Sequence, residues 1–233
     1  MQYRHELKYP INSGMYAILK SRLDAVLEKD KNVKDGAYRV TSLYFDNIYH
    51  TAYRDKMSGN MNRKKFRIRT YDLDPSYIRL EEKVKDDNVG YKKNALLTYD
   101  EYVKIINGDT DFLGEERFYD TAGEDFFTSV CASGLKPAVI VDYIRAPYIC
   151  RAGNVRVTLD SSLHVCYNTF DMFSKDAVFY PVQKGNEAVL ELKYDNFLPN
   201  YVGEILSGLS LRQEAVSKFT LCTDKAKIMK YGL

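Results

Sequence analysis

The sequence of 233 residues has no tryptophan, only three histidines and only four cysteines. The cysteines lie far apart and form no CxxC pair, so we interpret them as reduced thiols and expect a cytoplasmic protein. The histidines show no metal-ligand spacing, which argues against a zinc site. No run of about 18 apolar residues is present, and the N-terminus lacks the apolar segment of a signal peptide. The sequence therefore predicts no membrane span in this chain, and it encodes no membrane partner, although one is possible.

The chain also has little net charge, because 34 basic residues are balanced by 32 acidic ones to give +2. The basic residues are instead sorted into stripes, which indicates a local anion site and not a generally basic surface. A platform of basic and aromatic residues, as single-stranded nucleic acids require, is missing. The sequence thus argues against a nucleic-acid partner.

The most informative stretch contains two charged segments, Arg63–Arg69 and Ile78–Lys85. Charge recurs at every second residue in both, which is the periodicity of a β-strand. Turn-forming residues at 72–76 separate the segments and predict a hairpin. One face of this hairpin is expected to carry Arg63, Lys65, Arg67, Arg69, Arg79, Glu81, Lys83 and Lys85.

Strands and helices are predicted along the whole chain. Further strands are expected over residues 3–9, 38–46, 138–145, 154–160 and 188–194. Helices are expected over about 12–29, 51–56, 98–106, 115–133 and 213–230. Pro10 is expected to end the first strand, 86–90 to form a turn, Gly134 to cap a helix and Pro137 to stop it. No repeat or linker divides the chain, so we predict one domain over 1–233.

Several predicted strands carry charge on one face and apolar side chains on the other, and Glu-x-Lys occurs three times, at Glu6, Glu81 and Glu191. For a single strand the simpler interpretation is a solvated face of an antiparallel sheet. The repetition and the abundance of arginine favour a different one. If the helices cover the apolar face, the charged face lines the inside of a closed or strongly curled sheet. Unpaired buried charge is costly, so we predict an α+β fold whose basic lumen is either a wet channel or holds a polyanion.

At this point the chain resembles the catalytic domain of the vacuolar transporter chaperone (VTC) family, within the triphosphate tunnel metalloenzyme or CYTH-like superfamily. The motifs that carry the resemblance occur in the family's order and span nearly the whole chain. They are Glu6-x-Lys8, Ser42-Leu43-Tyr44-Phe45-Asp46, Lys65-x-Arg67-x-Arg69, Glu81-x-Lys83-x-Lys85, Arg156-x-Thr158-x-Asp160, Leu190-Glu191-x-Lys193 and Ser217-Lys218-Phe219.

The resemblance implies a closed antiparallel eight-stranded β-barrel tunnel flanked by helices on the outside. It implies a polyphosphate polymerase, which transfers the γ-phosphoryl group of ATP to a growing polyphosphate chain with Mn²⁺ or Mg²⁺. By motif match, the residues that hold the nucleotide phosphates or the product chain are Lys8, Arg67, Arg69, Lys83, Arg156 and Lys218. Glu191 is the implied metal ligand. Further substrate-binding candidates for the same lumen are Lys85, Lys193, Ser217, Glu81 and Glu6.

One departure from the superfamily bears on the reaction. Its hydrolytic branch typically opens with Glu-x-Glu-x-Lys, whereas this chain has Arg4 at the first acidic position. Loss of that carboxylate removes a metal ligand and favours the polymerase. Two alternatives stay open: a tunnel-type inorganic or nucleoside triphosphatase, and a non-catalytic module that binds polyphosphate.

Overall fold

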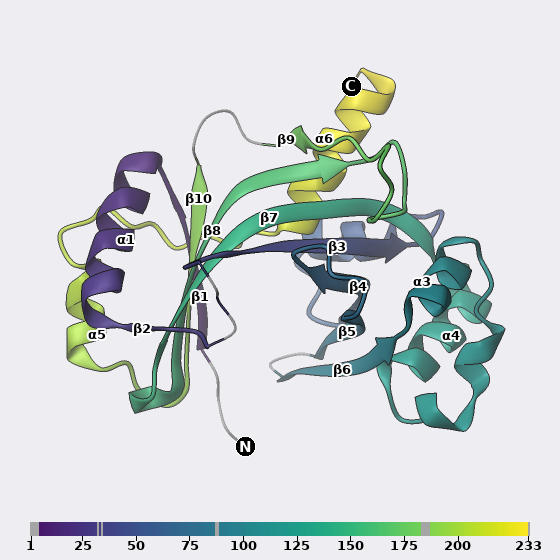
Figure 1. Ribbon diagram of the computed structural model, residues 1–233, viewed down its shortest axis with the longest axis horizontal. Helices are drawn as coiled ribbons and strands as arrows, with labels where there is room; N and C mark the ends of the chain where they lie inside the picture. Colours follow the sequence, from purple (N-terminus) through teal and green to yellow (C-terminus); the bar gives the residue numbers. More distant parts are fainter. Residues whose placement is uncertain (1–4, 32, 34, 87–88, 183–186, 233) are drawn as a thin grey trace. The chain divides into compact units, whose positions relative to one another are not determined.

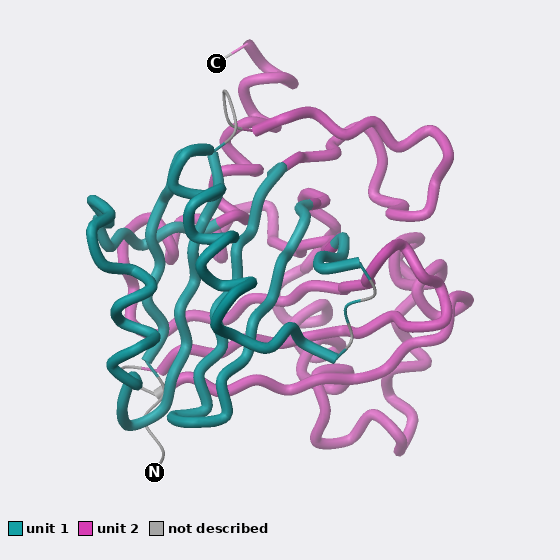
Figure 2. Tube along the Cα trace, turned by 60° about the vertical axis from the view of Figure 1, so that its left-hand side comes forward, with its two compact units in different colours: residues 1–39, 143–163, 183–217 teal, residues 40–142, 164–182, 218–233 magenta. Residues whose placement is uncertain are grey.

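The computed structural model describes residues 5–31, 33, 35–86, 89–182 and 187–232, so Tyr3, Arg4, Asp87 and Asn88 lie outside the described residues. The chain forms two compact units (Figure 2). Unit 1 consists of Met1–Arg39, Tyr143–Leu163 and Gln183–Ser217, and unit 2 consists of Val40–Asp142, His164–Val182 and Lys218–Leu233. Three long strands contribute residues to both: β3 (Tyr38–Asp46), β7 (Lys136–Cys150) and β8 (Val155–Cys166). The single domain over 1–233 stays a prediction.

The protein is α+β, as predicted, with one large antiparallel sheet. Hydrogen bonds order its main strands as β1-β10-β8-β7-β3-β4-β5-β6, while β2 pairs with β7 and β9 pairs with β8. The predicted closed barrel is wrong for the described residues, because no pairing there joins β1 to β6, the two ends of this order. Alternating charge indicates which face of a strand is polar, but it does not determine whether the last strand meets the first.

Unit 1 packs two helices against one face of its strands. Its elements are β1 (His5–Ile11), α1 (Ser13–Val26), β2 (Glu28–Lys29), a 3-10 turn (Ala152–Asn154), β10 (Ala188–Tyr194) and α5 (Asn200–Leu206), with parts of β3, β7 and β8. Figure 1 shows α1 and α5 beside each other on this face. Leu19 and Leu23 of α1 share one buried hydrophobic cluster with Val157, Leu190 and Val202. Because strand side chains alternate, the charged residues lie on the opposite face.

Unit 2 has a hydrophobic core of its own. Its elements are α2 (Thr51–Met57), β4 (Arg63–Tyr71), β5 (Ile78–Asp86), β6 (Val89–Leu97), α3 (Tyr99–Ile106), two 3-10 turns (Asp111–Gly114 and Glu116–Phe118), α4 (Ala122–Ser133), β9 (Tyr180–Pro181) and α6 (Lys218–Tyr231). Helices α3 and α4 lie beside β6 (Figure 1), and α4 contacts both β5 and β6. Phe66, Ile68 and Leu80 of the hairpin are buried in one cluster with Tyr102 of α3 and Phe126 of α4. Most charged residues of the hairpin again lie on the other face, whereas Lys64 and Glu82 share the apolar face.

Local capping signals fix several helix ends, among them the predicted cap at Gly134. The Asn12 side chain accepts a hydrogen bond from the Met15 amide at 2.9 Å and begins α1. Thr98 and Glu101 form a reciprocal capping box at the start of α3. Gly134 ends α4 with φ of 62°, a left-handed conformation that glycine adopts without a Cβ penalty.

The prediction that Pro10 ends the first strand is wrong, whereas α4 does end before Pro137, at Ser133. Pro10 lies within β1, opposite Val189 of β10, and β1 stands at one end of the strand order. Proline is tolerated on such an edge strand because its missing amide costs no ladder hydrogen bond. Pro137 lies in β7, directly after its first residue, Lys136.

Three helices are shorter than predicted. The helix expected over about 12–29 ends at Val26, and Glu28 and Lys29 form β2. The helix expected over 115–133 begins at Ala122, after Asp120 adopts a left-handed φ of 57° and Thr121 caps the helix. The helix expected over 213–230 begins at Lys218, so Ser217 is not part of it. The Glu214 amide donates instead to the Lys8 carbonyl at 2.9 Å, a contact remote in sequence that no local pattern reveals. Of the turn predicted over 86–90, Asp86 lies in β5 and Val89 and Gly90 lie in β6, while the other two residues lie outside the described ones.

Candidate functional site

The β4–β5 hairpin of unit 2 brings together the charges of the predicted stripe. Its antiparallel register is set by a tight turn in which Asp72 and Leu73 adopt φ of 51° and 53°. The residues facing each other across the two strands are Arg63 and Lys85, Lys65 and Lys83, Arg67 and Glu81, and Arg69 and Arg79. This face therefore carries seven cations and one carboxylate. We call these eight residues the hairpin cluster.

Glu81 is the anionic centre of the hairpin cluster. The Arg67 Nε donates to Glu81 Oε2 at 2.6 Å, and Arg69 lies 4.0 Å from the same oxygen. Burial by itself would raise the pKa of the Glu81 carboxyl, but the charges of Arg67 and Arg69 outweigh it and lower the pKa to about 2. Glu81 is therefore ionised and holds both arginines in place.

The two arginines are also held from the neighbouring strand β3. Arg69 Nε donates to Ser42 Oγ at 3.0 Å, and Arg67 Nη1 donates to the Tyr44 hydroxyl at 3.0 Å. Tyr44 itself stacks on Phe219 of α6 with ring centroids 4.9 Å apart. Both rings are buried, so Tyr44 packs in the protein and is not exposed for stacking on an adenine.

Lys65 belongs to the hairpin cluster, but the sequence analysis assigned it no role in binding. It is nevertheless the first residue of the motif Lys65-x-Arg67-x-Arg69, one of those on which the family resemblance rests. Its ammonium lies over the Phe219 ring, 4.8 Å from the centroid. Burial lowers the pKa of Lys65 to about 7, and the charges of Lys56, Arg63 and Lys83 add to this effect against a smaller opposing effect of Asp46. The period-two spacing of Lys65 and Arg67 is the sequence signal that places it on the charged face.

The other predicted cations of unit 2 are more exposed. Lys83 is exposed and Lys85 is half-buried, with its ammonium 4.0 Å from the Met61 sulfur. Lys218 is half-buried at the first position of α6, next to Phe219. The predicted site residues of unit 2 thus lie either on the hairpin or, for Lys218, at the start of α6, where the neighbouring Phe219 packs against Lys65 of the hairpin.

In unit 1 the charged residues of three strands form a second group. The register places Glu6 of β1, Lys193 of β10 and Arg156 of β8 in one row across the sheet, and Lys8, Glu191 and Thr158 in the next. The apolar residues between them face α1 and α5. Together with Arg145, Asp160 and Asp30, which contact them, we call these residues the strand cluster.

Ion pairs match every cation of the strand cluster to a carboxylate. The Lys8 ammonium lies 3.1 Å from Glu6, and Arg156 Nη2 lies 3.2 Å from Asp30. Arg145 forms a bidentate pair with Asp160, with both contacts at 2.7 Å. Lys193 pairs with Glu191. The strand cluster is thus close to neutral, in contrast to the hairpin cluster.

Glu191, the predicted metal ligand, is only 5% exposed. Burial alone would raise the pKa of its carboxyl, but the charges of Lys193, Lys8 and Arg145 outweigh burial and hold the pKa well below its usual range. Arg145 lies 3.9 Å from it. Glu191 is therefore a buried, ionised carboxylate in contact with cations.

Arg145 is the residue that the sequence analysis missed. It ends the predicted strand 138–145, whereas β7 continues to Cys150. Its side chain is 13% exposed and that of Asp160 is fully buried. No local spacing in the sequence links Arg145 to Asp160. The one signal that could have indicated a role for Arg145 is its charge within a mostly apolar strand.

Ser217 and Glu6 are the remaining candidates. Ser217 is half-buried and directly precedes α6, so the predicted helical turn containing both Ser217 and Lys218 is not formed. Glu6 pairs with Lys8, as described. The predicted site residues therefore fall into two groups, one in unit 1 and one in unit 2.

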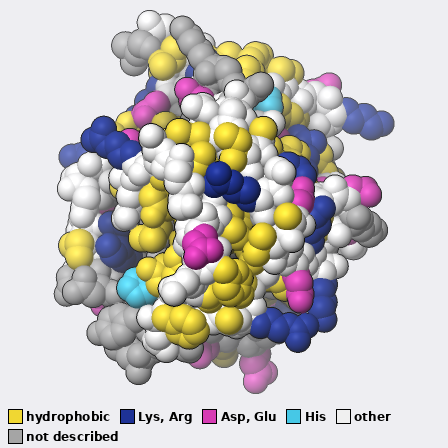
Figure 3. Space-filling model, turned by 90° about the vertical axis from the view of Figure 1, so that its left-hand side faces the viewer, with side chains coloured by type: hydrophobic (Ala, Val, Ile, Leu, Met, Phe, Trp, Pro, Cys, Tyr) yellow, Lys and Arg dark blue, Asp and Glu magenta, His cyan; other side chains and the backbone are white. Residues whose placement is uncertain are grey.

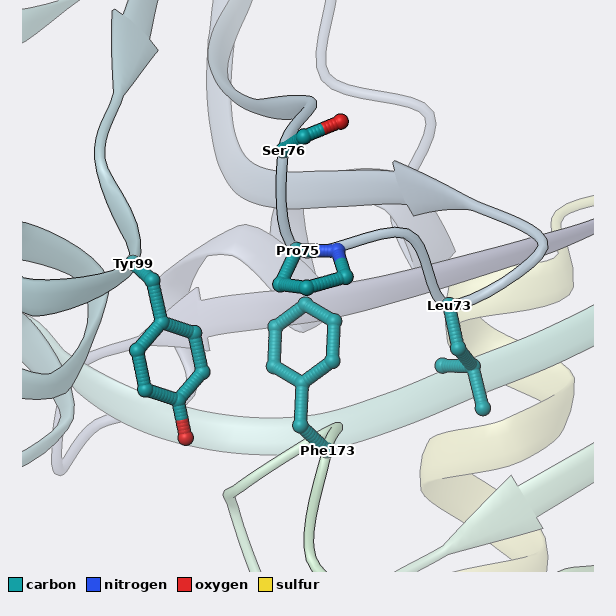
Figure 4. A pocket seen from close by; sticks show the side chains of 5 residues that line it. All are labelled: Leu73, Pro75, Ser76, Tyr99 and Phe173. Atoms are coloured by element: carbon teal, nitrogen blue, oxygen red, sulfur yellow. The ribbon is translucent and has the colours of Figure 1, made fainter.

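The uncharged cavity in Figure 4 and the outer face in Figure 3 do not offer a better site, whereas a cavity of about 520 Å³ in unit 2 is lined in part by Arg63, Lys65 and Lys85 of the hairpin cluster. The cavity of about 590 Å³ in Figure 4 lies in unit 2 and is lined by Leu73, Pro75, Ser76, Tyr99 and Phe173, none of them charged. On the face of unit 1 that carries α1 and α5, hydrophobic side chains gather in the middle and basic ones are scattered (Figure 3). The charged clusters are therefore the best candidates.

The described part of the chain contains neither a cluster of metal-ligating side chains nor a helix that could span a membrane. No group of three or more His, Cys, Asp or Glu side chains comes together there in a way that could hold a metal ion. Nor is any helix in that part long and apolar enough to cross a membrane. Glu191 therefore lies in no metal centre built of protein ligands alone within these residues.

Comparison with solved structures shows a fold shared with a Bacillus halodurans protein. A Bacillus halodurans protein described as a "putative adenylate cyclase" superposes with a TM-score of 0.55 at 16% identity, covering 97% of this chain and 95% of that chain. A Vibrio parahaemolyticus protein of the same description gives a TM-score of 0.48 at 14% identity, covering 94% and 97%. A Pyrococcus horikoshii OT3 protein gives 0.48 at 15%, covering 96% and 99%. No curated protein matches the sequence.

The sequence itself matches a family over nearly its whole length. The VTC domain model covers residues 3–227, which includes all residues of both clusters. The chain therefore belongs to the VTC domain family.

Proposed function

We propose that this protein is a polyphosphate polymerase, which transfers the γ-phosphoryl group of ATP to a growing polyphosphate chain. The observation that carries the proposal is the excess of cations in the hairpin cluster. Membership of the VTC domain family supports it, since the resemblance of the motifs implies this activity.

The register of the hairpin cluster suits a linear polyanion. Lys65 faces Lys83, and Arg69 faces Arg79. Like charges directly opposite each other destabilise a sheet, so an anion between the strands relieves the repulsion. Cations on one face recur every two residues, about 6.5 Å apart along a strand. A chain of phosphates meets such a row at several points, with bidentate contacts from arginine and point charges from lysine.

The strand cluster suits a different form of phosphate. Its cations are already matched by carboxylates, so its charge favours a triphosphate that arrives with a divalent cation over a bare polyanion. Mg²⁺ typically keeps one or two protein carboxylates, phosphate oxygens and several waters, and Glu191 fits the role of that carboxylate. We propose Mn²⁺ or Mg²⁺ as the cation, which when bound would neutralise charge on the phosphate oxygens.

The reaction needs no protein nucleophile. A terminal phosphate oxygen of the acceptor chain attacks the γ-phosphorus of ATP, the bond from that phosphorus to the bridging oxygen breaks, and ADP leaves with the electron pair. Arg67, Arg69 and Lys218 would bind phosphoryl oxygens and stabilise their charge. Lys8, Lys193 and Arg156 would orient the triphosphate. Positioning and electrostatics supply most of the catalysis in phosphoryl transfer.

Turnover of ATP by purified variants tests this proposal. With Mn²⁺, the wild type is expected to release ADP and form long phosphate chains on a gel, while Arg67→Ala and Glu191→Ala lose both. An exposed-surface variant, Lys175→Ala, serves as the matched control. Stoichiometric free phosphate without chains would point to a triphosphatase. Polyphosphate binding without any turnover would point to a binding module.

A further inference from the structure

Two buried polar groups of unit 1 lack a hydrogen-bond partner. Five buried side-chain atoms in the described residues have none, and three of them belong to Glu82 and Asp125. Those carboxylates each have a lysine close by, with Lys64 at 3.4 Å from Glu82 and Lys93 at 2.9 Å from Asp125. The remaining two atoms are Arg156 Nε and Thr158 Oγ1. Buried polar groups are nearly always paired, so these two call for an explanation.

Arg156 and Thr158 lie together on the charged face of β8. They are two residues apart, so their side chains point to the same side of the strand at a spacing of about 6.5 Å. Val157 between them is fully buried on the opposite, apolar face. Thr158 is 4% exposed and lies directly across from Glu191 in the register. The unpartnered hydroxyl is therefore placed in the strand cluster itself.

The chemistry of the two groups defines what can satisfy both. The Nε of arginine is a donor only, and the threonine hydroxyl donates or accepts. A shared partner must then accept hydrogen bonds, which a phosphoryl oxygen does and a metal ion does not. The other end of the Arg156 guanidinium is already engaged, since Nη2 lies 3.2 Å from Asp30 and donates to the Tyr38 hydroxyl at 3.3 Å. The guanidinium is thus fixed while its Nε stays available.

We propose that the Thr158 hydroxyl, together with Arg156 Nε, binds a phosphoryl oxygen of the triphosphate, which makes Thr158 a substrate-positioning residue. The inference rests on the proposed function and adds a residue to it. Thr158 adds a hydrogen bond without adding charge, which keeps the strand cluster neutral. Both atoms are covered in the ligand-free protein. The phosphoryl group therefore reaches them only after long side chains of this face, such as Lys193, have moved away from the two atoms.

The unmet hydrogen bond has a cost that mutation can expose. A buried hydroxyl without a partner destabilises the folded state, and an isosteric apolar group removes that penalty. Thr158→Val is therefore expected to raise the Tm of the ligand-free protein by roughly 2–4 °C. The same variant is expected to bind tripolyphosphate about 10-fold more weakly, the change expected for one lost hydrogen bond to a charged group. Thr158→Ser, which keeps the hydroxyl, is expected to restore binding.

A buried threonine with a satisfied hydroxyl provides the matched control. Thr70 is fully buried and donates to the Asp74 carbonyl at 2.8 Å. Thr70→Val is expected to lower the Tm and to leave tripolyphosphate affinity unchanged. Opposite signs of the Tm change in the two variants are the signature of the proposal.

The experiment measures Tm, tripolyphosphate affinity by calorimetry in the presence of Mn²⁺, and Mn²⁺ affinity without phosphate, for the wild type and all three variants. A lower Tm for Thr158→Val, or unchanged tripolyphosphate affinity, would overturn the inference by showing that the hydroxyl is paired within the protein or does not meet the ligand. Weaker Mn²⁺ binding without phosphate would overturn it too, because Thr158 would then be a metal ligand. If the wild type itself binds no tripolyphosphate, the proposed function fails and the inference fails with it.

Discussion

Arg67 of β4 donates its Nε hydrogen to Glu81 of β5 at 2.6 Å, directly across the hairpin. Glu81 is the one carboxylate among the eight residues of the hairpin cluster. Its Oε2 therefore occupies, in the ligand-free protein, the place beside Arg67 and Arg69 that a phosphate oxygen is proposed to take. This relationship leads to the first prediction.

Glu81→Gln is expected to destabilise the protein and to tighten phosphate binding. Without the carboxylate, two arginines stand beside each other with their main anion gone, and breaking a buried ion pair in this way costs about 3–5 kcal/mol. Tripolyphosphate should then stabilise Glu81→Gln more than it stabilises the wild type, because a ligand that binds more tightly adds more to the free energy of unfolding. Thermal unfolding with and without tripolyphosphate measures both effects, with exposed Glu116→Gln as the control. Weaker binding by Glu81→Gln would mean that Glu81 acts by positioning Arg67.

Lys65 is expected to make stability depend on pH above neutrality. Its pKa of about 7 in the folded protein lies below the 10.5 of a free lysine. Between these values the unfolded chain binds more protons, so the free energy of unfolding rises with pH across this window. Lys65→Met is expected to flatten that rise, whereas exposed Lys175→Met should keep it. Denaturant unfolding at several pH values measures the slopes, and equal slopes in all three proteins would contradict the assignment.

The same lysine links phosphate binding to protons. A polyanion favours the charged ammonium of Lys65. At a pH where Lys65 is partly deprotonated, tripolyphosphate binding should therefore be accompanied by proton uptake, and the affinity should fall as the pH rises above about 7. Calorimetry in buffers of different ionisation enthalpy measures the uptake, and Lys65→Met should reduce it. Proton uptake that is identical in wild type and variant would place the titrating group elsewhere.

Glu191→Gln is expected to separate metal dependence from phosphate binding. The uncharged amide leaves Lys193 without its carboxylate partner, so tripolyphosphate should bind more tightly when no metal is present. Turnover with Mn²⁺ should fall about 100-fold, since the variant lacks the carboxylate proposed to hold the ion. ADP release and Mn²⁺ titration check the two effects, and exposed Glu204→Gln of α5 serves as the control. Full Mn²⁺-dependent turnover in Glu191→Gln would remove Glu191 from the metal site.

Arg145 and Asp160 are expected to be strongly coupled in stability. Either Arg145→Met or Asp160→Asn leaves one buried, unmatched partner of a bidentate pair, at a cost of about 3–5 kcal/mol. The double variant should lose less than the sum of the two single changes. Urea unfolding of the four proteins gives the coupling energy, and strict additivity would show that the pair contributes no interaction of its own.

The hairpin and its charged face could be predicted because the information is local. Alternation at Lys65, Arg67 and Arg69 indicates the face, and the turn residues that follow Tyr71 limit the register. Caps such as Thr98 and Gly134 work for the same reason.

What escaped prediction depends on residues distant in sequence. The pairing of Arg145 with Asp160 requires the neighbouring placement of two long strands. The extended segment before Lys218 is held by a contact of Glu214 with Lys8, more than 200 residues away. Whether a sheet closes depends on the sum of strand pairings and twist, and no individual motif contains that information.

Transfer of label from ATP tests the central claim most directly. The protein is incubated with Mn²⁺ and ATP labelled in the γ-phosphate, and the label is followed into long chains and into free phosphate. We predict that the label enters chains that grow with time, in step with ADP release, and that Arg67→Ala abolishes both. Label that accumulates only as free phosphate would contradict a polymerase and identify a triphosphatase instead.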